Sequence, residues 1–248
     1  MAQKFARALC PYGSYGPKPR MNPWLLLSIS ATLCVSPQSR AADELIDQYL
    51  SVPGSYVFVR RAPEGEVAGQ VVMTVFEDFL CPACYRVVTE LIPRLSAKYG
   101  SRLAVRFVGY PFVHPDSRLP ARAYALAKEM GLGEQMQRAL FQAQFEEQLN
   151  TASREGLAKV ADSIGLDPAQ FLARLDAGEG TAEVERNIAL GASYHLDAVP
   201  GIIFDGWIRV TDLSQHNLEQ IINGLLEKKQ VSAHSPPNTP RAGGKQKP

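Results

Sequence analysis

Two cysteines separated by two residues form the pair in this sequence whose types and spacing are most suited to chemistry. Cys81 and Cys84 lie within "FEDFLCPACYRVV", with Pro82 and Ala83 between them. Such a pair can contribute to a metal site, form a structural disulfide, or exchange electrons through its thiols. The neighbouring residues distinguish these three possibilities.

A metal site and a structural disulfide are the weaker interpretations. Structural zinc usually takes four ligands, often as two close pairs. Here there is one close pair, and the four histidines are scattered without ligand spacing: His114, His195, His216 and His234. Closing so small a disulfide loop would constrain the unfolded chain little. We therefore expect no metal site and no organic cofactor.

Redox exchange suits the position of the pair between a strand and a helix. The apolar, β-branched run from Gln70 to Phe76 is typical of a buried strand, and helical periodicity starts at Pro82. Unpaired N–H groups and the positive dipole end at a helix start favour a thiolate at Cys81. Cys84 lies one turn further on, where it can attack a mixed disulfide made by Cys81. We expect a lowered pKa for Cys81, in the upper part of the range of about 3.5 to 7.5 seen for activated thiols, and none for Cys84.

The elements around the pair predict an α/β protein with a thioredoxin-like fold and an inserted all-helical domain. A second strand follows over 103–111, which completes a strand–helix–strand unit. About five helical pieces fill 120–190, with Asp167 and Thr181 as N-caps of two of them. Strands at 201–204 and 207–210 flank the turn dipeptide Asp205-Gly206, and a helix closes the fold.

Pro200 stands directly before the strand at 201–204, where a proline cannot donate to the sheet. In a thioredoxin-like fold that place is held by a cis-proline beside the dithiol. We therefore predict that the Val199–Pro200 bond is cis and lies against the cysteine pair.

The two ends of the sequence differ from the middle. An apolar stretch at 24–35 follows several basic residues and precedes "SRA" at 39–41, the layout of a secretory signal peptide with cleavage near Ala41. Cleavage would remove Cys10 and Cys34 and leave the Cys81–Cys84 pair in an oxidising compartment. The last segment, rich in Pro, Gly, Ser and Lys, predicts a disordered tail.

The net charge of +1 gives no field that would favour nucleic acid or a membrane surface.

"FEDFLCPACY", the Val199-Pro200 pair and the helical block between them resemble the DsbA-type branch of the thioredoxin superfamily. The segment "YPFVHPDSRLPARAYALA" at 110–127 is similar to this family's entry into its helical domain, and the resemblance covers about 70–227. It implies a secreted thiol–disulfide oxidoreductase with Cys81 as the exposed nucleophile and Cys84 as the resolving thiol. It also implies that Val199-Pro200 docks peptides, together with Pro82 and Ala83, and that a membrane redox partner resets the pair.

The sequence departs from the family pattern at two places. Many relatives have a histidine or an aromatic residue where Ala83 stands. Many thioredoxin-like proteins have a buried acid six residues before the nucleophile, where this sequence has Val75. Glu77 points to the same side of the strand and is a candidate for assisting proton transfer. The sequence leaves open whether Glu77 and Asp78 only cap or flank the turn.

Together these features predict an exported, monomeric enzyme that introduces disulfides into secreted proteins bearing thiols. A reductase or isomerase of the same fold, and a peptide-binding module without catalysis, are the alternatives. The expected organisation is a leader (1–41), a thioredoxin-like domain in two parts (42–116 and 191–228), an inserted helical domain (117–190) and a disordered tail (229–248).

Overall fold

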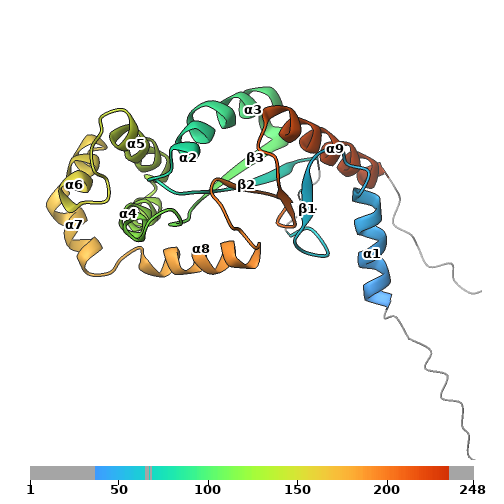
Figure 1. Ribbon diagram of the computed structural model, residues 1–248, viewed down its shortest axis with the longest axis horizontal. Coiled ribbons are helices and arrows are strands. Elements are labelled where there is room, and N and C mark those ends of the chain that lie inside the picture. The colour runs from blue at the N-terminus through green and yellow to red at the C-terminus, as the bar shows by residue number, and fades with distance from the viewer. Residues whose placement is uncertain (1–36, 65–66, 68, 235–248) are drawn as a thin grey trace, which may run out of the picture. The chain divides into compact units, whose positions relative to one another are not determined.

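The computed structural model of the protein describes residues 37–64, 67 and 69–234 (Figure 1). The apolar stretch of the predicted signal peptide and the chain beyond residue 234 lie outside the described residues. None of the helices in the described part of the chain combines the length and the apolar character that a membrane crossing requires.

Within the described residues, five strands form one mixed sheet in the spatial order β1-β5-β4-β2-β3. The strands are β1 (Tyr56–Phe58), β2 (Val71–Glu77), β3 (Leu103–Gly109), β4 (Gly201–Phe204) and β5 (Ile208–Val210). β2 and β3 pair in parallel, whereas β4 lies antiparallel to both β2 and β5, and β5 lies antiparallel to β1. This arrangement confirms the predicted strand–helix–strand unit followed by a two-stranded hairpin.

The crossover between β2 and β3 is one continuous helical segment. It consists of α2 (Pro82–Arg86), a π-helical turn (Val87–Leu91) and α3 (Ile92–Tyr99), and a short 3₁₀ turn (Gly100–Arg102) leads into β3. In the π-helical turn the N–H of Ile92 reaches back to the carbonyl of Val87. The next residue, Pro93, has no N–H to give the preceding turn, which accounts for the altered register at this point.

The two faces of the sheet pack against different helices because side chains alternate along a strand. Val71, Met73 and Val75 of β2 point into a core shared with α3 and α9 (Gln215–His234). Phe76 points to the other face, where the rings of Tyr110 and Tyr194 meet its edge at centroid distances of 5.7 and 5.8 Å.

Two helices, one near each end of the described chain, extend into segments where the sequence analysis predicted none. α1 (Pro37–Tyr49), for which we predicted no element, runs through the expected cleavage position at Ala41, and Tyr49 packs against Trp207 at 4.9 Å. α9 continues to His234, so the prediction of a disordered tail from residue 229 is wrong for its first residues. The reason is a buried anchor: Lys229 forms an ion pair with Asp205 at 3.0 Å and donates to the carbonyl of Gln70 at 2.8 Å.

Five helices follow β3 after a short 3₁₀ turn (Pro115–Ser117), in the number that the sequence indicates. They are α4 (Arg118–Glu129), α5 (Gly133–Phe145), α6 (Arg154–Ser163), α7 (Pro168–Asp176) and α8 (Thr181–Ser193). Asp167 caps α7 as predicted, with its carboxylate accepting from the N–H of Gln170 at 2.9 Å. The cap of α8 is not Thr181 but Gly180, whose φ of 77° and close approach to the Arg122 carbonyl leave no room for a side chain.

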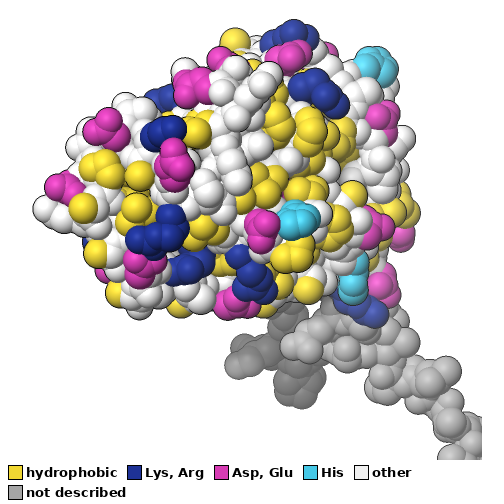
Figure 2. All heavy atoms as spheres, turned by 60° about the vertical axis from the view of Figure 1, so that its left-hand side comes forward, with side chains coloured by type: hydrophobic (Ala, Val, Ile, Leu, Met, Phe, Trp, Pro, Cys, Tyr) yellow, Lys and Arg dark blue, Asp and Glu magenta, His cyan; other side chains and the backbone are white. Residues whose placement is uncertain are grey.

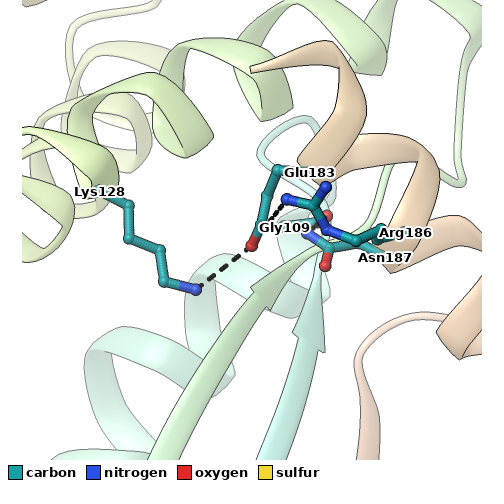
Figure 3. Close-up of polar contacts among 5 residues, drawn as sticks. All are labelled: Gly109, Lys128, Glu183, Arg186 and Asn187. Carbon is teal, nitrogen blue, oxygen red and sulfur yellow. Dashed lines mark hydrogen bonds and ion pairs between the residues drawn. The ribbon is translucent and has the colours of Figure 1, made fainter.

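α8 is joined to the sheet and to α4 by polar contacts (Figure 3). The amide of Asn187 donates to the carbonyl of Gly109 at 3.1 Å, where β3 ends. Glu183 accepts from Arg186 at 2.9 Å and from Lys128 of α4 at 3.5 Å. Because ion pairs with exposed partners contribute little, the buried bond from Asn187 is the stronger anchor.

Figure 2 shows the face on which the helical block comes forward. Basic and acidic side chains are interspersed over it, with hydrophobic side chains gathered between them. No large patch of one charge sign is seen on this face of the described residues.

Candidate active site

Cys81 lies at the junction of β2 and α2, where the sequence places it. Its backbone is extended, with φ −94° and ψ 116°, and its sulfur accepts from the N–H of Cys84 at 3.4 Å. Pro82 occupies the first helical position and needs no partner for an N–H. Cys81 is therefore the N-cap of the helix, and its sulfur sits where the helix offers unpaired donors.

Both cysteines are free thiols in the structure, and both are buried. Cys81 is 5% exposed and Cys84 is 0% exposed. The expectation of an exposed Cys81 is wrong, because this side chain belongs to the apolar cluster that the helical block builds around Phe79 and Phe141. Within the same cluster, the carbonyl oxygen of Val199 lies 3.8 Å from the Cys81 sulfur, within reach of an S–H donor.

The surroundings shift the pKa values of the two thiols in opposite directions, and both directions are the ones expected from the sequence. The hydrogen bond from the Cys84 thiol, with the N–H groups of Cys84 and Ala83, lowers the pKa of Cys81 from 9.0 to about 6, although burial and the charge of Asp78 act against it. Donating that same bond raises the pKa of Cys84 strongly, and burial adds to the effect. Near neutral pH the pair therefore holds one thiolate at Cys81 and one proton at Cys84.

The Val199–Pro200 peptide bond is cis, as predicted. Beside it lies a groove of about 350 Å³, lined by Pro200 and Ala83 together with Arg86, Val87, Glu90, Leu91, Arg94 and Leu213. Two of the four residues expected to contact substrate thus line one groove. Of the other two, Pro82 is exposed at the helix start and Val199 supplies the carbonyl next to the Cys81 sulfur.

Glu77 is the last residue of β2, four residues before Cys81, and is completely buried. Its two carboxylate oxygens accept from the amide nitrogen of Gln137 at 2.7 and 2.8 Å. Burial raises the pKa of Glu77 from 4.5 to about 8, and the bond from Gln137 opposes the rise. Its charge in turn contributes to the raised pKa of Cys84, which places this carboxyl group within electrostatic reach of that thiol.

Asp78 has a larger part in the site than the sequence analysis gave it. Its backbone N–H donates to the Cys84 sulfur at 3.4 Å, and its carbonyl accepts from the N–H of Cys81 at 3.0 Å. One carboxylate oxygen accepts from Leu80 at 2.8 Å, and the other accepts from Phe112 and Val113 at 2.7 and 2.8 Å. An aspartate directly after a strand, able to bond the N–H two residues on, is the local signal that indicates such a turn.

Replacing Asp78 with alanine should lower the free energy of unfolding by about 3 kcal/mol, because three backbone N–H groups at a buried site would lose their acceptor. Asp116→Ala, which changes an exposed aspartate of the same loop region, is the matched control and should change stability by less than about 0.5 kcal/mol. Urea unfolding of the three proteins measures both values. Equal losses in the two variants would show that Asp78 does not hold the turn.

No cluster of three or more His, Cys, Asp or Glu side chains suited to a metal ion occurs among the residues that the structure describes.

Comparison with known proteins agrees with this geometry. A family model described as "DSBA-like thioredoxin domain" matches residues 86–223, more than half of the chain, starting just after the cysteine pair. The structure is similar to DsbA from Xylella fastidiosa (TM-score 0.61, 20% identity, covering 73% of this chain and 99% of that one). It is also similar to DsbA from Pseudomonas aeruginosa (TM-score 0.59, 19% identity, covering 73% of this chain and 95% of that one). A third similar structure is a thioredoxin-like oxidoreductase from Silicibacter pomeroyi (TM-score 0.54, 21% identity, covering 73% of this chain and 97% of that one).

A further similar structure is Proteus mirabilis DsbA with a non-covalently bound peptide, PWATCDS (TM-score 0.50, 18% identity, covering 75% of this chain and 98% of that one). At these identities the solved structures show a shared fold, and the family model shows the relationship. The chain belongs to the family of DSBA-like thioredoxin domains and is a thiol–disulfide oxidoreductase.

Proposed function

We propose that this protein is an exported oxidase that introduces disulfides into secreted proteins. Cys81 acts as the nucleophile, Cys84 as the resolving thiol, and Glu77 assists proton transfer. The observation that carries the proposal is the place of Cys81 as the N-cap of α2, where its sulfur accepts from the N–H of Cys84 at 3.4 Å and its pKa is lowered. A thiolate stabilised in the dithiol form stabilises the reduced protein, so the corresponding disulfide tends to take electrons from substrate dithiols.

The reaction proceeds by two exchanges. A substrate thiolate attacks the Cys81 sulfur of the enzyme disulfide, a substrate–Cys81 disulfide forms, and Cys84 leaves and takes up a proton. A second substrate thiolate then attacks the substrate sulfur of that mixed disulfide, the substrate disulfide forms, and Cys81 leaves as a thiolate. The two electrons released by the substrate thiols remain on the enzyme dithiol, and a membrane redox partner removes them.

The groove beside Pro200 and Ala83 supports the binding of an extended peptide next to Cys81. The cysteine-containing peptide seen with Proteus mirabilis DsbA is a ligand of this kind. On the loop that Asp78 holds, Phe112 and Val113 are 42% and 46% exposed, and they offer apolar contacts to an unfolded chain. We propose that the enzyme acts as a monomer on such chains.

Measuring the reduction potential of the Cys81–Cys84 pair in glutathione buffers tests whether electrons flow from the substrate to the enzyme, as in an oxidase. An oxidase should have a potential above that of the glutathione pool of an exported compartment, about −180 to −210 mV in the ER lumen. A potential near that of thioredoxin, about −270 mV, would assign the protein to the reductases. A disulfide that glutathione does not exchange at all would favour a peptide-binding module.

Export is tested separately by the mass of the mature protein. Cleavage near Ala41 predicts a chain that lacks Cys10 and Cys34 and is recovered outside the cytosol. An intact leader on protein recovered from the cytosol would contradict the proposed location and weaken the oxidase role, since cytosolic pools keep thiols reduced.

Replacing Ala83 with histidine should lower the pKa of Cys81 further and make the disulfide more oxidising. A protonated or hydrogen-bonding imidazole between the cysteines would stabilise the thiolate, which the methyl side chain of Ala83 cannot do. Ultraviolet absorbance of the thiolate against pH measures the change. Ala192→His, at an exposed position of α8, is the control and should leave the Cys81 titration unaltered. Identical titrations for Ala83→His and the wild type would contradict this electrostatic explanation.

A further inference from the structure

The contact between Glu77 and Gln137 joins the strand that leads to the dithiol with the inserted helical block. Glu77 is the last residue of β2, and Gln137 lies on α5 in the inserted helical block. Both are buried, with exposed fractions of 0% and 5%. Within the described residues, Gln137 is the side chain that donates to the Glu77 carboxylate, and it reaches both oxygens, at 2.7 and 2.8 Å.

The chemistry of the pair requires a proton to move at a place that water does not reach. Cys84 is 0% exposed, and its thiol is hydrogen-bonded to Cys81 with its pKa raised. When the dithiol is oxidised, Cys84 must lose this proton as it attacks the mixed disulfide on Cys81. Glu77 is the buried carboxyl group that offers a place for it, because the carboxylate of Asp78 is already occupied by three backbone N–H groups.

We infer that Gln137 is a positioning residue for this proton transfer: its amide orients the Glu77 carboxyl group and favours the ionised form, which can accept the proton of Cys84. The inference rests on the proposed function of the Cys81–Cys84 pair. In the step concerned, the Cys84 sulfur attacks the Cys81 sulfur, the Cys81–Cys84 bond forms, the bond from Cys81 to the bound thiol breaks, and that thiol leaves with the electron pair. The proton of Cys84 goes to the carboxylate of Glu77.

The physical basis is that hydrogen bonds donated to a carboxylate favour its charged form. Burial raises the pKa of Glu77 to about 8, and the amide of Gln137 opposes this rise. Among the residues that the structure describes, the titratable groups that interact with Glu77 or adjoin it are Cys84, Tyr124 and its chain neighbour Asp78, and none of these supplies a positive charge. Without the amide, the carboxyl group would remain protonated to a higher pH and could not accept the proton of Cys84.

The experiment follows the resolving step alone. The reduced protein is mixed with oxidised glutathione, which forms a mixed disulfide on Cys81, and acid-quenched samples are analysed by mass spectrometry as the glutathione adduct disappears. For the wild type, the rate of disappearance should rise with pH through a midpoint near 8. Gln137→Met removes the donor at similar side-chain length and should raise this midpoint by about one pH unit. At a pH below both midpoints, the glutathione adduct should disappear about tenfold more slowly in the variant than in the wild type.

Three further variants make the result specific. Gln142→Met changes an exposed glutamine of the same helix and should leave the profile unaltered. Gln137→Asn withdraws the amide by one methylene group and should shift the midpoint in the same direction, which gives a second reading should the methionine variant fold poorly. In a Glu77→Gln background, Gln137→Met should have no further effect on the rate.

An unchanged midpoint in both folded Gln137 variants would overturn the inference, as would a shift of equal size in Gln142→Met. A Glu77→Gln variant with the wild-type pH profile would also overturn it. Failure of the proposed function looks different, because a wild-type protein that forms no adduct with oxidised glutathione would show no resolving step at any pH.

Discussion

Replacement of Cys81 with alanine is expected to reduce dithiol oxidation and insulin reduction to the uncatalysed rate. The reason is that Cys81 holds the thiolate of the pair, with its pKa lowered to about 6, whereas Cys84 stays protonated. In the Cys81→Ala variant the bond between the thiols is lost, but Cys84 stays buried, and burial disfavours its reactive thiolate form. Turnover of a peptide with two cysteines, followed by mass spectrometry, measures the effect.

Cys84→Ala is the matched variant, because it removes the other sulfur and keeps the proposed nucleophile. It should still react with disulfides, and it should accumulate mixed disulfides on Cys81, since the proposed resolving thiol is absent. Turnover by Cys81→Ala, or adducts on Cys84 in that variant, would mean that the roles of the two cysteines are reversed.

The second large effect is a loss of stability with rising pH that originates at Glu77. Burial raises the pKa of this carboxyl group from 4.5 to about 8, so between these values the folded protein keeps a proton that the unfolded chain releases. Stability from this group is therefore complete below about pH 4.5 and is lost as the pH rises through about 8. The size of the shift corresponds to roughly 3 to 5 kcal/mol in the free energy of unfolding.

Urea unfolding of the wild type and Glu77→Gln between pH 5 and 8.5 tests this linkage. The glutamine side chain of the variant does not titrate, so the difference in stability between the two proteins should move in favour of the variant as the pH rises. Both proteins are compared in the oxidised form, because the lowered pKa of Cys81 in the dithiol form gives a slope of opposite sign. A constant difference across this range would show that Glu77 titrates normally in the folded protein.

The sequence by itself determined the chemistry and the order of the elements. The spacing of Cys81 and Cys84, and their position between an apolar strand and a helix, are local features, because a helix start is specified by a few adjacent residues. The proline before β4 is equally local, and its cis bond agrees with the prediction. The directions of the two pKa shifts also agree with the prediction, and their largest cause is the hydrogen bond between two thiols that the spacing of the pair brings together.

Only the tertiary structure decided how these groups are surrounded. Glu77 and Gln137 are sixty residues apart in the sequence, and neither has a local feature that predicts their bond. The burial of Cys81 under the helical block, and the hold of Asp78 on Phe112 and Val113, likewise depend on how the inserted helices and the loop after β3 fold back onto the turn. Lys229 is a similar case, since the composition of its segment suggested a solvated tail and its ion pair with Asp205 draws it into the core. In each case the partner lies far away in the chain. The desolvation that raises the pKa of Glu77, and adds to the raised pKa of Cys84, depends on contacts that no short segment contains.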